Sequence, residues 1–161
     1  MNEQEALFLR VIEEHKRIIY KVCFVYAKDE DTINDLYQEV VLNLWKALPR
    51  FRNESKLSTW VYRIALNTCL SYLRLSKRQP QTVPLLLSMS EIFADEQDKE
   101  NLKELYRLIG RLGEMERAVI LLWLDEKSYK EISEILGISP SVVGVRINRI
   151  KAKLREMSSN N

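Results

Sequence analysis

The chain has 161 residues, of which 46% are hydrophobic and 30% are charged, and its formal net charge is +2. This composition indicates one ordinary globular domain or two very small ones and excludes a disordered chain, while two cysteines and four glycines argue against a disulfide scaffold or a turn-rich β fold. The longest apolar run has seven residues, far fewer than the roughly 20 that span a bilayer, and the N-terminus does not resemble a secretory signal. We therefore expect a cytoplasmic protein with no membrane insertion.

Apolar residues that recur at steps of three and four predict three helices in the first half of the chain. The first two run through residues 7–26 and 33–44, and Pro49 is expected to end the second because proline cannot continue a helix. After a short polar connection, Ser58 is expected to cap a third helix. The inner face of that helix is predicted to contain Val61, Ile64, Ala65, Thr68 and Tyr72.

The helical pattern fails between residues 76 and 90, where Pro80 and Pro84 interrupt a polar stretch that is typical of a linker. A fourth helix is predicted from about residue 91 to residue 112, and three more follow at residues 113–125, 128–136 and 139–157. We therefore predict an all-α protein with two small helical domains, joined by a flexible linker. The domains are placed at residues 1–78 and 100–161, and the linker at residues 79–99.

The small net charge results from four blocks of opposite sign. Residues 29–39 carry five acids and no base, and residues 91–104 carry six acids and two bases. Residues 46–78 carry eight bases and one acid, and residues 139–155 carry five bases and no acid. A charged run is often only a solvated face, but two basic blocks with helical periodicity favour a nucleic-acid partner.

The last two predicted helices have the pattern of a helix-turn-helix. Gly137 lies at the turn, where a positive φ is expected, and Ser139 and Pro140 suit the cap and first turn of the next helix. That helix has an inner face of Val143, Ile147, Ile150 and Leu154, and an opposite arc of Ser141, Val145, Asn148 and Ala152, flanked by Arg149 and Arg155. Small and polar side chains beside arginines suit a major groove. The alternative is an ordinary basic amphipathic helix.

Two features of the first half suggest further contacts. The second helix has an acidic, amide-bearing face that suits a protein partner, unless it is simply solvated, and this face is formed by Asp35, Gln38 and Glu39. On the third helix, Trp60 and Arg63 follow the basic loop Arg52–Lys56, an arrangement that can stack on and hold unpaired bases. A tryptophan at a helix start is, however, more often part of the core.

These segments resemble the extracytoplasmic-function sigma factors of bacteria, a group within the sigma-70 family. The resemblance rests on D-L-x-Q-E-V-x-L-x-L-W from Asp35 and on F-R-x-E-S-K-x-x-T-W-x-Y-R-I-A-x-N from Phe51, followed by the helix-turn-helix. It covers nearly the whole chain. It implies a two-domain initiation factor that binds core RNA polymerase, recognises the −35 and −10 elements of promoter DNA and opens its strands.

The resemblance also implies three sites and a set of partners. Core polymerase, through its β′ clamp helices, would contact Asp35, Gln38 and Glu39, and the β flap would be a further contact. The −10 element would be captured and melted by Arg52, Asn53, Glu54, Ser55, Lys56, Thr59, Trp60, Arg63 and Asn67. The −35 element would be read by Ser139, Ser141, Val142, Val145, Arg146, Asn148, Arg149 and Lys151. An inhibitory anti-sigma factor is a further expected partner.

The chain departs from the family at several positions. Family members often have glycine at Asn53, aspartate at Ser71, a basic residue at Gly144 and a small hydroxyl residue at Val145. A glycine inside a helix costs roughly 1 kcal/mol relative to alanine, so Gly144 indicates close approach of the backbone to DNA or to the neighbouring helix. Val145 suits contact with a thymine methyl.

Two other classes of function fit less well. A transcriptional regulator with a ligand-sensing N-terminal half would share the helix-turn-helix, but no glycine-rich loop or metal cluster marks a sensor. An enzyme would need a nucleophile or metal site, and His15, the single histidine, is expected to be an exposed helix residue. Cys23 and Cys69 are expected to be buried hydrophobic residues. We therefore predict no enzymatic activity, no catalytic residues, no cofactor and no metal.

Overall fold

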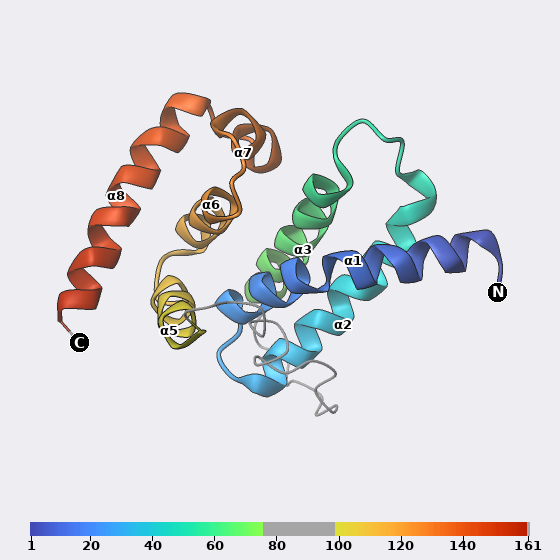
Figure 1. Cartoon of the computed structure of the whole chain (residues 1–161), viewed down its shortest axis with the longest axis horizontal. Coiled ribbons are helices and arrows are strands. Elements are labelled where there is room, and N and C mark those ends of the chain that lie inside the picture. Colours follow the sequence, from blue (N-terminus) through green and yellow to red (C-terminus); the bar gives the residue numbers. More distant parts are fainter. Residues whose placement is uncertain (76–98, 161) are drawn as a thin grey trace. The chain divides into compact units, whose positions relative to one another are not determined.

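The computed structural model describes residues 1–75 and 99–160, and Figure 1 shows their helices. The chain divides into two compact units, Met1–Asp95 and Glu96–Asn161. The described residues contain no strand, which confirms the all-α prediction for them. The predicted linker at residues 79–99 lies outside the described residues, apart from Lys99. Within the described part of the chain, no helix is both long and apolar enough to cross a bilayer.

In its described residues the first unit contains three α-helices, each of which packs against the other two. They are α1 (Glu3–Tyr26), α2 (Glu30–Ala47) and α3 (Leu57–Arg74), with a short 3-10 helix η1 (Leu48–Arg50) after α2. The side chains of Asn2 and Asp29 cap α1 and α2, each accepting a backbone N–H bond of 2.8 Å. The core between the helices is fully buried and includes Val22, Leu36, Val40, Leu44, Val61 and Ala65.

One predicted helix end is confirmed and one predicted helix start differs. α2 ends at Ala47, just before Pro49, which lies inside η1, where its missing N–H is tolerated in a first turn. The predicted cap Ser58 is wrong: the N-cap of α3 is Lys56, and no side chain caps this helix. Because Leu57 already has a helical backbone, Ser58 lies within the first turn and not before it.

The second unit contains four helices in the described residues. They are α5 (Lys99–Ile109), α6 (Glu114–Leu124), α7 (Tyr129–Leu136) and α8 (Pro140–Ser159). α6, α7 and α8 pack against one another, and α5 packs against α8. The start of the fourth predicted helix, at residues 91–98, lies outside the described residues. The core of this unit is fully buried and includes Ile109, Ile120, Leu122, Ile132 and Ile147.

Candidate nucleic-acid and protein interfaces

The turn between α7 and α8 has the predicted helix-turn-helix geometry. Ser128 and Glu131 cap the start of α7 with two reciprocal bonds between side chain and backbone. Gly137 ends α7 with a φ of 72°, a left-handed conformation that glycine adopts without steric cost. Ser139 then accepts the N–H bond of Val142, and Pro140 occupies the first turn of α8. These observations confirm the predicted turn and caps.

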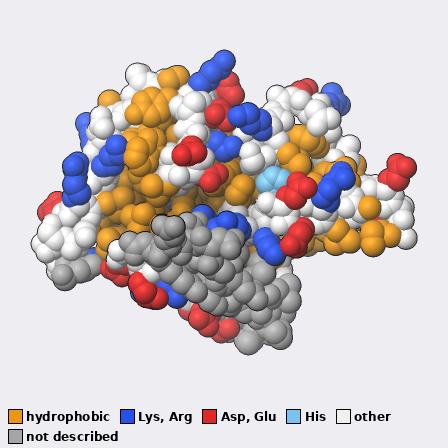
Figure 2. Space-filling model, viewed as in Figure 1, with side chains coloured by type: hydrophobic (Ala, Val, Ile, Leu, Met, Phe, Trp, Pro, Cys, Tyr) orange, Lys and Arg blue, Asp and Glu red, His pale blue; other side chains and the backbone are white. Residues whose placement is uncertain are grey.

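α8 has one buried face and one exposed face, as its periodicity predicts. Val143, Ile147 and Ile150 are completely buried, and Leu154 is half-buried. Figure 2 shows Lys and Arg side chains at the left of the view, where α8 runs in Figure 1. Of the residues predicted to read the −35 element, six are exposed: Ser139, Ser141, Val142, Val145, Asn148 and Arg149.

The basic residues of α8 have different surroundings. Arg149 and Arg155 are exposed, whereas the Lys151 ammonium lies 4.1 Å from the centroid of the Trp123 ring on α6. Lys153 forms a 3.0 Å ion pair with Glu116, also on α6. Only part of the basic block is therefore free of contacts with α6.

The Glu116 carboxylate is held in its charged form at the start of α6. Partial burial raises its pKa, but hydrogen bonds from Lys153 and from the Gly113 N–H outweigh burial. The half-buried Arg146 acts in the same direction through its charge, and the pKa of Glu116 lies below its usual value of 4.5. This carboxylate links the start of α6 to the second half of α8.

Gly144 lies against the neighbouring helix. A Cβ atom at this position would lie 3.2 Å from the Cε2 atom of Tyr129, closer than ordinary van der Waals contact. The Tyr129 ring at the start of α7 therefore occupies the space that a side chain at position 144 would need. Of the two explanations offered by the sequence, approach to the neighbouring helix is the one observed.

The loop between η1 and α3 has an unusual backbone at Asn53. Its φ is 59°, in the left-handed region that glycine and asparagine adopt most readily. This conformation suits both asparagine and the glycine that the resemblance implies at this position. Arg52, Asn53, Glu54 and Lys56 are exposed, and Ser55 is half-buried.

The loop packs against the start of α3. The rings of Phe51 and Trp60 lie 4.9 Å apart, and Trp60 is only 9% exposed. Thr59 is also buried, whereas Arg63 is half-buried and Asn67 is exposed. The inner face of α3 is thus wider than predicted, since it includes Thr59, Trp60, Tyr62, Leu66 and Cys69, while Ile64 and Tyr72 are only half-buried.

A groove of about 280 Å³ runs between α2 and α3. Glu39 and Asn67 both line it, so residues predicted to contact polymerase and DNA share one depression. Its base is fixed by a hydrogen bond of 2.9 Å from the Asn43 amide to the Thr68 hydroxyl, which in turn donates to the Ile64 carbonyl.

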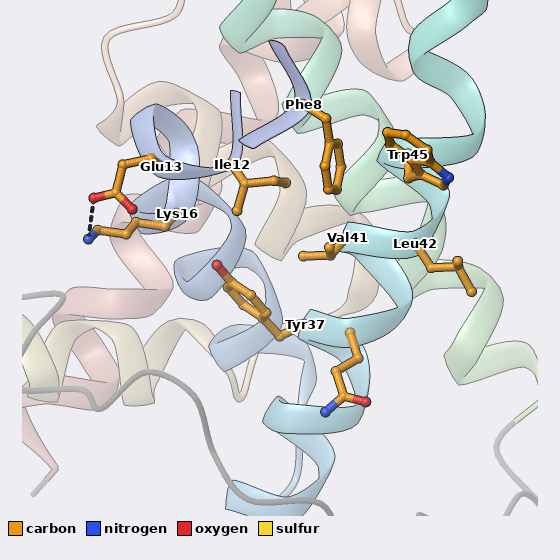
Figure 3. Close-up of a pocket in the computed structure, with 9 residues that line it drawn as sticks. Phe8, Ile12, Glu13, Lys16, Tyr37, Val41, Leu42 and Trp45 are labelled. Carbon is orange, nitrogen blue, oxygen red and sulfur yellow. Dashed lines mark hydrogen bonds and ion pairs between the residues drawn. The ribbon is translucent and has the colours of Figure 1, made fainter. Parts of the chain in front are cut away.

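A second, more apolar groove of about 500 Å³ lies between α1 and α2 (Figure 3). Phe8 and Trp45 meet edge to face across it, with ring centroids 5.0 Å apart. Gln38, predicted to contact polymerase, lines this groove, and burial raises the pKa of the neighbouring Tyr37 to about 12. The third residue of the predicted docking face, Asp35, is half-buried.

No motif in the sequence predicts this groove. Its walls include Phe8 and Ile12 of α1, which lie outside the sequence motifs of this chain. One feature of the sequence did point to it. Val41 and Leu42 are apolar residues of α2 that lie outside its buried face, and Leu42 is 45% exposed. Apolar residues outside the inward stripe of a helix indicate a second apolar surface.

The residues considered for other functions are mostly structural. Both cysteines are buried, as predicted, and burial raises the pKa of the Cys23 thiol, with the nearby Cys69 thiol adding to the shift. The prediction for His15 is wrong, because it is half-buried and its Nδ1–H donates to the Val11 carbonyl at 2.8 Å. No cluster of His, Cys, Asp or Glu among the described residues could hold a metal ion.

Comparisons with known proteins match both units. Residues 11–79 match the model of Sigma-70 region 2, and residues 102–154 match the model of Sigma-70, region 4. The RNA polymerase sigma factor SigZ of Bacillus subtilis is 33% identical, over 81% of this chain and 75% of its own length. The ECF RNA polymerase sigma-E factor of Escherichia coli is 30% identical, over 92% of this chain and 84% of its own length.

A solved structure has the same fold. It contains the sigma factor RpoE in complex with the anti-sigma factor NepR from Bartonella quintana, and its TM-score against this chain is 0.70. The likeness covers 99% of this chain and 98% of that one at 17% identity, so it bears on the fold alone.

Proposed function

This chain belongs to the extracytoplasmic-function sigma factors of the sigma-70 family, the proteins that direct bacterial RNA polymerase to promoters and start transcription, and we propose that its two units divide promoter recognition between them. Within the first unit, the predicted domain at residues 1–78 docks on core polymerase and captures the −10 element. Within the second unit, the predicted domain at residues 100–161 reads the −35 element. The observation that carries this division is the outer face of α8, which presents polar, apolar and basic side chains on a preformed helix.

Polymerase docking is assigned to the face of α2 that contains Asp35, Gln38 and Glu39. Gln38 and Glu39 each border a groove, so the β′ clamp helices would meet polar side chains with an apolar groove on one side and a more polar groove on the other. Such a pairing of apolar anchors with a polar rim is typical of protein interfaces.

Capture of the −10 element is assigned to the loop before α3 and to the exposed side of that helix. The exposed cations Arg52 and Lys56 suit phosphates, and Asn53 and Asn67 offer hydrogen bonds to an extruded base. The buried Thr59 and Trp60 act by positioning the loop, because their side chains are covered in this conformation.

Regulation by an anti-sigma factor and action in the cytoplasm complete the proposal. The protein acts there as an initiation factor and not as a catalyst. An anti-sigma factor that covers the groove between α1 and α2 would block Gln38 and compete with core polymerase. Support comes from the apolar lining of this groove, in which Leu42 is 45% exposed. The competition is measured as release of labelled core polymerase from this chain when the anti-sigma factor is added.

The proposal as a whole is tested by in vitro transcription. Purified core polymerase is combined with the full chain and with fragments of the genome that encodes it. We expect initiation at specific sites only when both proteins are present. If no fragment supports initiation that depends on this chain, the proposal is wrong.

A double variant tests the docking face directly. In Gln38→Ala/Glu39→Ala, affinity for core polymerase is expected to fall by roughly tenfold or more, since two side chains at the centre of an interface are lost. The matched control is Glu30→Ala, which removes an exposed acid from the same helix and, at 100° per residue, lies outside this face. Equal affinities for the double variant and the control would remove the assignment.

A further inference from the structure

Two valines stand on the outer face of α8, close to its N-terminus. Val142 is 38% exposed and Val145 is 50% exposed, and the two lie one turn apart. The same helix packs its other face into the unit through Val143, Ile147 and Ile150. The two exposed valines are therefore not needed for the core.

Helix stability does not explain these valines either. A β-branched side chain loses χ1 freedom in a helix and is less favourable there than alanine. Single exposed apolar residues are common on protein surfaces, but here two occur together within a face whose other members are polar or, at Ala152, small. That face includes Ser141, Asn148 and Arg149, all exposed.

The contact with α7 and the period of the helix together define which residues of α8 point away from the rest of the unit. Gly144 is covered by the Tyr129 ring, so this flank of the helix belongs to the interface with α7. At 100° per residue, Val145 points away from the buried Ile147 and Ile150, and Arg149 lies between Val142 and Val145 in angle. The outermost strip near the start of α8 is thus apolar, with a cation beside it.

We infer that Val142 and Val145 recognise the 5-methyl groups of thymines in the major groove of the −35 element. This inference rests on the proposed role of α8 in reading that element. Thymine is the base that presents a methyl group at the major-groove edge, and apolar side chains distinguish it through contact with that methyl. Arg149, between the two valines, is placed to bind a phosphate and so to hold the helix in register.

The test uses deoxyuridine, which differs from thymidine only in that its base lacks the 5-methyl group. Holoenzyme assembled from the full chain and core polymerase selects duplexes from a fully randomised library. The selected upstream element is then synthesised with each thymine replaced in turn by deoxyuridine. For at least one thymine, we expect the affinity of the holoenzyme to fall by about three- to tenfold, the effect of one lost apolar contact.

Variants separate methyl contact from contact with the DNA backbone. With Val145→Ala or Val142→Ala, the thymine and deoxyuridine duplexes are expected to bind equally well at the matching position, because the contact has already been removed. Alanine favours the helix, so both variants keep α8 folded. Asn148→Ala is the matched control: it lowers affinity for both duplexes and preserves their ratio.

The outcomes distinguish this inference from the proposed function. If an element is selected but no thymine in it is sensitive to loss of the methyl, the inference is wrong and the role of α8 stands. The same holds if the sensitivity survives in both valine variants. If the holoenzyme selects no upstream element, the proposed role of α8 fails and the inference fails with it.

Discussion

The outer face of α8 and the loop before α3 present side chains to solvent by different means. On α8 the exposed residues are set by the period of one helix, which begins at the cap Ser139. The loop depends on contacts further along the chain, since Phe51 lies against the buried Trp60. It also depends on the left-handed backbone of Asn53.

This difference has a consequence for substitution. Changes on the outer face of α8 remove contacts with a partner and leave the fold intact, because the helix is held from its other side. Changes in the support of the loop alter both the stability of the first unit and the shape of its surface. Binding and stability should therefore separate cleanly in the second unit and remain coupled in the first.

The largest expected effect is on the support of the loop. Trp60→Ala should lower the free energy of unfolding of the first unit by about 3–5 kcal/mol, since it leaves a cavity beside Phe51. Amide hydrogen exchange in α3 measures this loss. Trp123→Ala in the second unit is the control and should cost that unit less, because Trp123 is only half-buried. Similar losses in the two units would contradict the comparison.

The next effect concerns two cations of α8. Arg149→Ala should weaken binding of the full chain to duplex DNA by roughly tenfold and reduce the salt slope by about one, as expected for a lost phosphate contact. Lys151→Ala should weaken binding less, because its ammonium already lies over Trp123. Fluorescence anisotropy at several salt concentrations measures both. A larger effect of Lys151 would reverse this ranking.

A smaller effect is expected at Asn53. Asn53→Ala should destabilise the first unit by about 1 kcal/mol. A left-handed backbone is costly for alanine, because alanine has a Cβ atom but cannot form the local side-chain hydrogen bonds available to asparagine. Asn53→Gly should leave stability unchanged or raise it. Urea denaturation of the two variants provides the measurement, and equal stabilities would show that the left-handed conformation is not retained.

The smallest effect depends on pH and involves Glu116. Its pKa is lowered in the folded chain, so its contribution to stability is present above its usual value of 4.5 and is lost as the pH falls through the folded value. The contribution should be less than about 1 kcal/mol, because Lys153 is 56% exposed. Glu116→Gln should flatten the acid side of the stability profile of the second unit. A profile that is unchanged from that of the parent chain would refute this assignment.

Features that depend on neighbouring residues in the chain could be predicted from the sequence. The positive φ of Gly137, the cap at Ser139 and the inner face of α8 are all local, and each was predicted. The face of α2 was likewise predictable as a helical surface.

Features that depend on packing between helices could not be predicted. The burial of Trp60 follows from its contact with Phe51 across the loop, and the groove beside Gln38 requires α1 and α2 to lie side by side. The predicted Ser58 cap is wrong because α3 begins one residue earlier, at Leu57, and its N-cap Lys56 makes no capping bond with its side chain. The reason for a glycine at position 144 could not be predicted either, because it depends on the position of the Tyr129 ring on another helix.

The burial of both cysteines makes the chain well suited to labelling. Cys23 and Cys69 are its only cysteines and neither is exposed to solvent, so reagents that need an accessible thiolate will not modify the folded protein. New cysteines at Glu14 and Glu134, two exposed positions in different units, would then accept a pair of dyes without removal of the native residues. Energy transfer between the dyes would report the distance between the units in the free protein and in the holoenzyme.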